Sequence, residues 1–265
     1  MKNDDKDIIK EIIATGSEIS GGVGGAIIGN IVAGPVGAIW GGASGPVLTR
    51  LFKSIGTEIK GRFLSRREEV RIGAAYTFAL NKIHRNQELG LELRKDDFFG
   101  NAENDRPPSV EILEGIILSS QREFEELKLK YLGNLYANIC YDSGISREHA
   151  NQLIKTADSL TFRQFCILQL LNERYIASEQ LNFKIRALDK WQLDQMDIIA
   201  EVRELNQIGL VYIPLTYDGG DNSSPIQLSK LNITKNGRFF CKVLSLDEIE
   251  SEILDKLNAQ TSIKE

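Results

Sequence analysis

The sequence predicts a mainly α-helical protein. A glycine-zipper hydrophobic helix or hairpin precedes a helical middle domain and a C-terminal winged-helix-like α+β module. An uncharged run, residues 19–49, has a small residue at every fourth position. Apolar residues at helical spacing fill much of 70–157. From Leu160, two helical segments are followed by a strand, a turn-rich loop, a second strand and a helix.

Length and composition fit one elaborate domain or two small ones in a chain of 265 residues. The 32 Lys and Arg against 37 Asp and Glu give a net charge of −5, which argues against a duplex-DNA coat protein. Three widely spaced cysteines and two histidines suggest neither a disulfide framework nor a metal site, so no cofactor is expected. The predicted boundaries are 1–18 amphipathic segment, 19–49 glycine zipper, 50–145 basic linker and helical domain, 146–245 winged-helix-like domain, and 246–265 C-terminal helix and tail.

The glycine-rich run contains no charge from Ile19 to Thr49, and ten of the 23 glycines lie between Gly21 and Gly45. Small residues four apart share one face of a helix and let another backbone approach closely, as in GxxxG association in lipid. The unbroken row is Gly21, Gly25, Gly29, Ala33, Gly37, Gly41 and Gly45. A second row, from Gly22 to Gly42, runs beside it. This pattern predicts a membrane or oligomerisation segment.

Two features complicate a simple membrane span. Pro35 would break or kink a helix near the middle of the run, leaving two arms of ~21 Å that are too short to cross a bilayer alone. Only eleven of the 31 residues are large and apolar, so the affinity for lipid is modest. We expect insertion as an oligomer or on a trigger. The alternative is close packing inside a soluble protein.

The flanks favour an orientation. Residues 50–71 carry a local net charge of +4 and residues 1–18 one of −2, so the positive-inside rule places the C-terminal part in the cytoplasm. Ile8, Ile9, Ile12 and Ile13 give the leading segment one apolar helical face.

The middle of the chain predicts helices. One runs through Val70–His84, and residues 86–108 form a polar loop. Ser109 is expected to cap one long helix to about Tyr141, with Phe124 and Leu127 on its inward face. A short helix starts after Ser146 and continues to Ala157.

The C-terminal part follows winged-helix order. Thr161 and Gln164 form a capping box that opens a helix to Glu173. A helix over 191–208 ends at Gly209, strands follow over 210–216 and 226–234, and a last helix begins after Thr234. The helix before the wing has one base, Arg203, against four carboxylates, so sequence-specific binding of duplex DNA is disfavoured.

No catalytic motif is present, and the chain is not expected to be an enzyme. A pairing of Cys140 with His149 is disfavoured because Cys140 lies on an apolar helix. The candidate anion- or ligand-binding residues are Arg66, Arg67, Arg71, His84 and Arg85. For the first three, the alternative is a basic flank that contacts anionic lipid headgroups. For His84, the alternative is an exposed histidine near a helix end.

Four segments resemble the abortive-infection alpha proteins over roughly residues 65–245. They are Glu111–Leu127 (EILEGIILSSQREFEEL), Tyr131–Asn138 (YLGNLYAN), Leu160–Leu168 (LTFRQFCIL) and Leu231–Phe240 (LNITKNGRFF). The resemblance implies phage defence through cell arrest or death. With the glycine zipper, the chain also resembles Hailong-type membrane effectors paired with nucleotidyltransferases. That implies a homo-oligomeric inner-membrane channel gated by a nucleotide or single-stranded oligonucleotide. The alternative is a soluble winged-helix regulator or adaptor.

Overall fold

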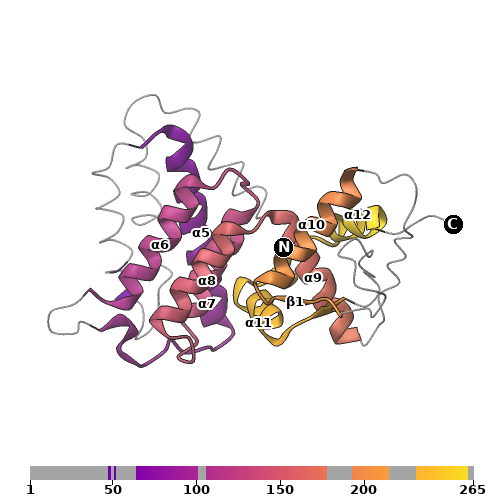
Figure 1. Cartoon of the computed structure of the whole chain (residues 1–265). Helices are drawn as coiled ribbons and strands as arrows, with labels where there is room; N and C mark the ends of the chain where they lie inside the picture. Colours follow the sequence, from indigo (N-terminus) through magenta and orange to yellow (C-terminus); the bar gives the residue numbers. More distant parts are fainter. Residues whose placement is uncertain are drawn as a thin grey trace. The chain divides into compact units, whose positions relative to one another are not determined.

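The computed structural model describes residues 47–48, 51, 64–100, 106–177, 193–214 and 231–261. These residues are mainly helical and include one two-stranded sheet (Figure 1), which confirms the predicted mainly α class. The chain divides into two compact units, with the boundary between Ser159 and Leu160. The glycine zipper lies outside the described residues.

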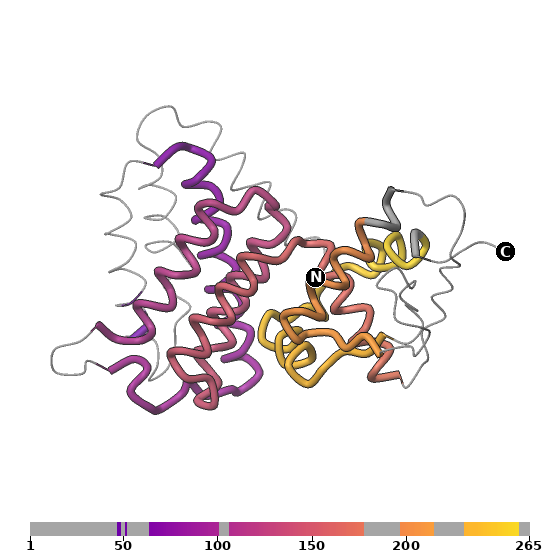
Figure 2. The backbone as a smooth tube through the Cα atoms, in the orientation of Figure 1, coloured from indigo at the N-terminus to yellow at the C-terminus, as the bar shows by residue number. Residues whose placement is uncertain are grey.

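From residue 64 on, the described part of unit 1 contains four α-helices and a short 3-10 helix, and residues 47–48 and 51 are also helical. Helix α5 packs against both α6 and α7, and α8 packs against α6 and α7 (Figure 2). Residues 146–157, which the sequence grouped with the C-terminal module, therefore lie in unit 1. The elements are α5 (Arg66–Glu88), η1 (Asp97–Phe99), α6 (Pro108–Arg122), α7 (Lys128–Ile139) and α8 (Arg147–Ser159).

Helix α5 forms where the periodicity predicts a helix. Ser65 and Glu68 make a capping box at its start, and the apolar stripe from Ile72 to Ile83 is buried. The helix crosses α7 at Gly133, where an added Cβ would lie 2.5 Å from the carbonyl oxygen of Ala75. A glycine is therefore required for the two backbones to approach so closely.

The single helix predicted from Ser109 to Tyr141 is wrong, because α6 ends at Arg122 and α7 begins at Lys128. Glu123 leaves helical geometry and its carboxylate pairs with the Lys128 ammonium at 2.5 Å, with 4% and 2% of the two side chains exposed. The same carboxylate accepts a hydrogen bond from the Glu125 amide. This buried ion pair fixes a turn where the apolar periodicity alone favours a continuous helix.

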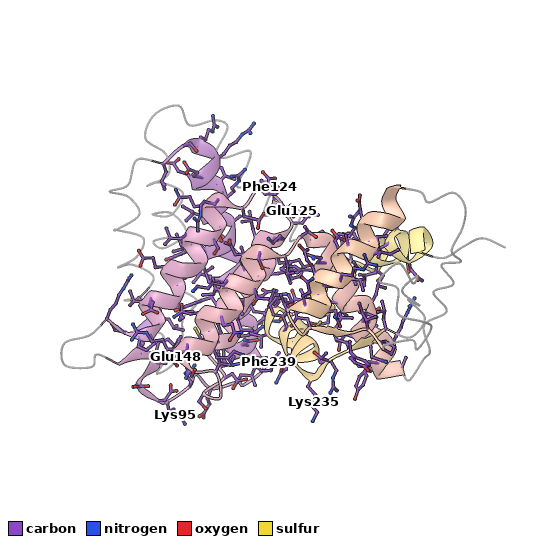
Figure 3. The ribbon with its side chains drawn as sticks, viewed as in Figure 1. Lys95, Phe124, Glu125, Glu148, Lys235 and Phe239 are labelled. Atoms are coloured by element: carbon purple, nitrogen blue, oxygen red, sulfur yellow. The ribbon has the colours of Figure 1, made fainter. Side chains whose placement is uncertain are left out.

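The residues around this turn differ from the prediction as well. Phe124 and Leu127, expected to face inward, are 79% and 50% exposed. Figure 3 labels Phe124. Ser109 is not the cap: Pro107 precedes the first turn, Pro108 occupies its first position, and Ser109 is buried. Proline suits the first position of a helix because the backbone N–H that it lacks would have no acceptor within the helix there. The Ser146 hydroxyl does accept a hydrogen bond from the His149 amide, as predicted for the start of α8.

Unit 2 has four described helices, a 3-10 helix and two short strands. Helix α9 packs against α10, α11 and α12, and the Phe165 and Phe240 rings meet edge to face with centroids 6.0 Å apart. The elements are α9 (Phe162–Ala177), α10 (Leu193–Gln207), β1 (Val211–Tyr212), β2 (Asn232–Ile233), α11 (Lys235–Leu244), η3 (Leu246–Glu248) and α12 (Ser251–Thr261).

The local signals in unit 2 are confirmed. Thr161 and Gln164 exchange the two hydrogen bonds of a capping box. Gly209 follows α10 with a φ of 76°, a conformation that glycine adopts without steric penalty. Strands β1 and β2 pair antiparallel, with Val211 opposite Ile233, but each is shorter than predicted, since Ile213 and Pro214 do not continue β1 and Leu231 does not belong to β2. The Thr234 hydroxyl caps α11 by accepting a hydrogen bond from the Gly237 amide.

Candidate functional site at the start of α5

The first turn of α5 carries two of the predicted ligand residues. Arg66 and Arg67 are the first residues of the helix, and both are exposed. Their position follows from the Ser65 cap, because the N-cap residue sets where the helix begins. Two guanidinium groups with exposed side chains can bind phosphate oxygens from solvent or from a lipid headgroup.

The N-terminal end of α5 is already occupied by a carboxylate of the chain itself. Glu68 accepts hydrogen bonds from the Gln121 side-chain amide at 2.8 Å and from the Ser65 amide at 2.7 Å. These bonds, that from Gln121 first, lower the pKa of Glu68 to about 2. A helix N-terminus attracts anions through its unpaired amides and its dipole. Here the Glu68 carboxylate lies at that end and accepts the hydrogen bond of the Ser65 amide.

Arg71 lies at the same end of α5 but is held against α6. Its Nη1 donates a hydrogen bond to the Gln121 carbonyl oxygen at 3.4 Å, and its side chain is half-buried. The structure thus gives Arg71 a contact between helices, while Arg66 and Arg67 are exposed. The three arginines lie at one end of α5.

His84 and Arg85 lie at the opposite end of α5, about 25 Å along the axis from Arg66 and Arg67 at ~1.5 Å per residue. The His84 Nε2 is 3.3 Å from a carboxylate oxygen of Glu88, one turn later on the same helix. Arg85 lies in the last turn, where a cation complements the helix dipole. The five candidate residues therefore form two separate groups and not one site.

The zipper residues Gly21 to Gly45, with Ala33 and Pro35, lie outside the described residues. Described residues near the end of the uncharged run are Val47, which is 42% exposed, and Leu48, which is fully buried. Leu51, just beyond the run, is 6% exposed. Protein atoms therefore cover both leucines. None of the described helices has both the length and the hydropathy needed to span a membrane.

The thiol chemistry weighed from the sequence is disfavoured by burial. Cys140 has no exposed surface, and burial raises the pKa of its thiol to about 12. A thiol at that pKa stays protonated at neutral pH and is a poor nucleophile. Over the described part of the chain, no three His, Cys, Asp or Glu side chains are grouped as metal ligands.

Two sets of charged residues that the sequence did not single out have clear structural positions. One is the buried pair of Glu123 and Lys128, which no short-range pattern announces. The other is a row of cations on α11, Lys235, Arg238 and Lys242. Their spacing of three and four residues is a signal that was present in the sequence.

Comparison of the chain with family models, curated proteins and solved structures finds no match.

Proposed function

We propose that the chain is a non-enzymatic membrane effector of anti-phage abortive infection. Residues 19–49 of several copies associate in the bacterial inner membrane and permeabilise it by forming or gating an ion channel. The part of the chain that follows residue 49 lies in the cytoplasm and controls that assembly in response to a nucleotide or single-stranded oligonucleotide signal. A soluble state before activation is compatible with this scheme.

The observation that carries the proposal is the register of small residues in an uncharged stretch. Seven of them recur every fourth residue from Gly21 to Gly45, and a parallel row lies beside them. In lipid, helix association depends on close packing more than on the hydrophobic effect, and small residues permit that packing. Replacement of three of these small residues by large apolar ones would prevent the close approach of two helices while raising the hydropathy of the segment.

The first turn of α5 supports the lipid-facing interpretation of Arg66 and Arg67. The Glu68 carboxylate already lies at the helix end, and Arg71 contacts the Gln121 carbonyl, whereas Arg66 and Arg67 are exposed. Exposed guanidinium groups within the basic stretch 50–71 suit anionic headgroups on the cytoplasmic side.

The order of elements in unit 2 supports a winged-helix-like sensor. Helices α9 and α10 precede the β1–β2 pair, and α11 follows it. On α10, Glu201 pairs with Arg163 at 2.7 Å, and Glu204 accepts a hydrogen bond from Gln164 at 2.8 Å. Two of the four carboxylates counted against duplex DNA thus hold α10 to α9. The exposed Asp197 and the single Arg203 still make this helix a poor reader of a DNA groove.

The burial of Leu48 and Leu51 favours a second candidate, a soluble winged-helix regulator or adaptor with a structural glycine-rich segment. If the glycine-rich segment were packed inside a soluble protein, leucines near its C-terminal end would be buried, as Leu48 and Leu51 are. Such a protein would have no membrane-integrated population in the cell.

Fractionation of bacteria that express the full chain separates the two candidates. Membranes from infected and uninfected cells are washed at alkaline pH, which removes peripheral proteins. The effector proposal predicts chain that stays in the washed membrane pellet and cross-links as oligomers, at least after infection. Recovery of all the chain in the soluble fraction under both conditions would overturn it and favour the regulator.

A further inference from the structure

The outward face of α11 is a row of cations. Gly237, Phe240, Cys241, Val243 and Leu244 are buried on one side of this helix. Lys235 and Lys242 are exposed on the other side, with Arg238 half-buried between them. Figure 3 labels Lys235 and Phe239 on this element. The helix contains no acidic residue, so all of its charge is positive and lies on one face.

These cations have no carboxylate partner among the described residues. The ion pairs of unit 2 involve Arg163 with Glu201 and Lys256 with Glu252, and none involves α11. The nearest acidic residue along the chain, Asp247, follows the C-terminal end of the helix and is exposed. Residues 160–265 contain 12 Lys and Arg against 15 Asp and Glu. The face is therefore a local cationic surface on an otherwise acidic unit.

An aromatic ring on α9 holds the central cation in place. The guanidinium carbon of Arg238 lies 4.1 Å from the centroid of the Tyr175 ring. Its Nε is buried and has no hydrogen-bond partner among the described residues. Stacking on a ring fixes the plane of a guanidinium group, and because the Nε is buried, the Nη groups are the donors left for an oxyanion. Tyr175 is itself 51% exposed.

The dimensions of the row fit a phosphodiester chain. Steps of three and four residues along a helix are about 4.5 and 6 Å, so the row is about 10 Å long. One strand of stacked DNA carries a phosphate per about 3.4 Å of helix axis, and the spacing is longer when the strand is extended. A row of about 10 Å therefore matches two or three phosphates of an extended strand. An exposed tyrosine and the half-buried Phe239 beside the row offer surfaces on which bases stack.

We propose that the outward face of α11, formed by Lys235, Arg238 and Lys242 with Tyr175 behind Arg238, binds the backbone of a single-stranded nucleic acid. A single strand fits better than a duplex for two reasons. A single row of cations can contact the phosphates of one strand, and the acidic remainder of the unit would repel a second phosphate chain. This inference names the ligand surface of the proposed sensing unit and therefore rests on the proposed function.

The test is fluorescence anisotropy with the full chain and a labelled 20-nucleotide single strand of mixed sequence, as DNA and as RNA. The substitution Lys235→Gln, Arg238→Gln and Lys242→Gln is expected to weaken binding about ten-fold or more at moderate salt. It should also lower the slope of log affinity against log salt by about 2, since single strands contribute about 0.7 per phosphate contact. The single substitution Tyr175→Leu should also weaken binding relative to the wild type. The single substitution Tyr175→Phe should leave the affinity close to that of the wild type, because the ring is kept.

The matched control is Arg122→Gln, Lys155→Gln and Arg203→Gln, which removes the same charge from three exposed side chains elsewhere. It should change the affinity by less than about two-fold, because each cation acts mainly within a screening length of about 10 Å. Equal losses in both triple variants would overturn the inference, as would the absence of single-strand binding by the wild type. Stronger binding of the same face to duplex DNA or to phosphatidylglycerol vesicles would also overturn it.

The assay also separates this inference from the proposed function. A chain that permeabilises vesicles but binds no single strand would keep the effector role and lose the α11 site. A chain that binds single strands through α11 but stays soluble in infected cells would keep the site and lose the effector role.

Discussion

Two basic residues of unit 1 with buried side chains, Lys128 and Arg94, differ in their surroundings from the cations of α11. In unit 1, Lys128 is buried against Glu123 and also donates to the Asp158 carbonyl. Arg94, 5% exposed, pairs with Asp96 and donates to the Ile145 carbonyl. The cations of α11 have no carboxylate partner among the described residues and include two exposed lysines. Cations of the first kind connect loops to helices, and those of the second kind are available to a ligand.

The largest effect is expected at Lys128. Lys128→Met leaves the buried Glu123 carboxylate without its ammonium partner, which should lower the free energy of unfolding by about 3–5 kcal/mol. Urea unfolding of the full chain measures the loss. Lys128→Met combined with Glu123→Leu should recover much of it, because no buried charge then remains. A loss below about 1 kcal/mol in the single variant would contradict a structural role for this pair.

A smaller effect is expected where packing, and not charge, holds unit 1 together. Gly133→Ala places a Cβ 2.5 Å from the Ala75 carbonyl oxygen and should cost about 1–3 kcal/mol, since α5 and α7 must separate. Gly115→Ala on α6 is the control, because its Cβ meets only the end of the Ile154 side chain at 3.2 Å. Thermal unfolding should show a loss for the first variant alone. Equal behaviour of the two variants would show that α5 and α7 tolerate wider spacing.

The α11 triple glutamine variant should leave stability almost unchanged. Lys235 and Lys242 are exposed and Arg238 loses only its stacking on Tyr175, so the free energy of unfolding should fall by about 1 kcal/mol or less. Urea unfolding checks this on the same sample that is tested for binding. A loss above about 2 kcal/mol would show that these residues are structural and would remove the contrast with unit 1.

The smallest effect is a pH dependence at the first turn of α5. The pKa of Glu68 is lowered from 4.5 to about 2 by hydrogen bonds from Gln121 and Ser65. Its stabilising contribution is therefore complete above pH 4.5 and is lost as the pH falls from there toward 2. The thermal midpoint of the wild type should exceed that of Glu68→Gln at pH 6, and the difference should narrow at pH 3. A constant difference between the two pH values would contradict this role.

Local signals predicted much of the fold. The Thr161–Gln164 capping box, Gly209 after α10 and the Thr234 cap before α11 each mark an element boundary within a few residues. The break between α6 and α7 could not be predicted in this way. It depends on Lys128 reaching the Asp158 carbonyl, 30 residues away, and on burial of the Glu123 carboxylate. The apolar spacing through Phe124 and Leu127 is the same whether the helix continues or stops.

The candidate site was predicted less well than the fold. The basic stretch near Arg66 was visible in the sequence, but the contact of Arg71 with Gln121 joins residues 50 positions apart. His84 and Arg85 lie on the same helix as Arg66, and only helix length shows that they are too distant to act with it. The spacing of the α11 cations was visible in the sequence, but the ring that stacks on Arg238 was not predictable from it. Tyr175 comes from another helix.

The central claim, that residues 19–49 bring copies of the chain together in lipid, is tested most directly by ion leakage. The full chain is reconstituted in anionic vesicles, and leakage is measured with and without a single-stranded oligonucleotide. Replacement of Gly29, Gly37 and Gly41 by Leu should abolish leakage, because it fills the row of small residues. Replacement of Gly24, Ala43 and Ser44 by Leu, three positions outside both rows, should leave leakage close to that of the wild type. Leakage by the first variant equal to that of the wild type, or no leakage by the wild type under either condition, would contradict the claim.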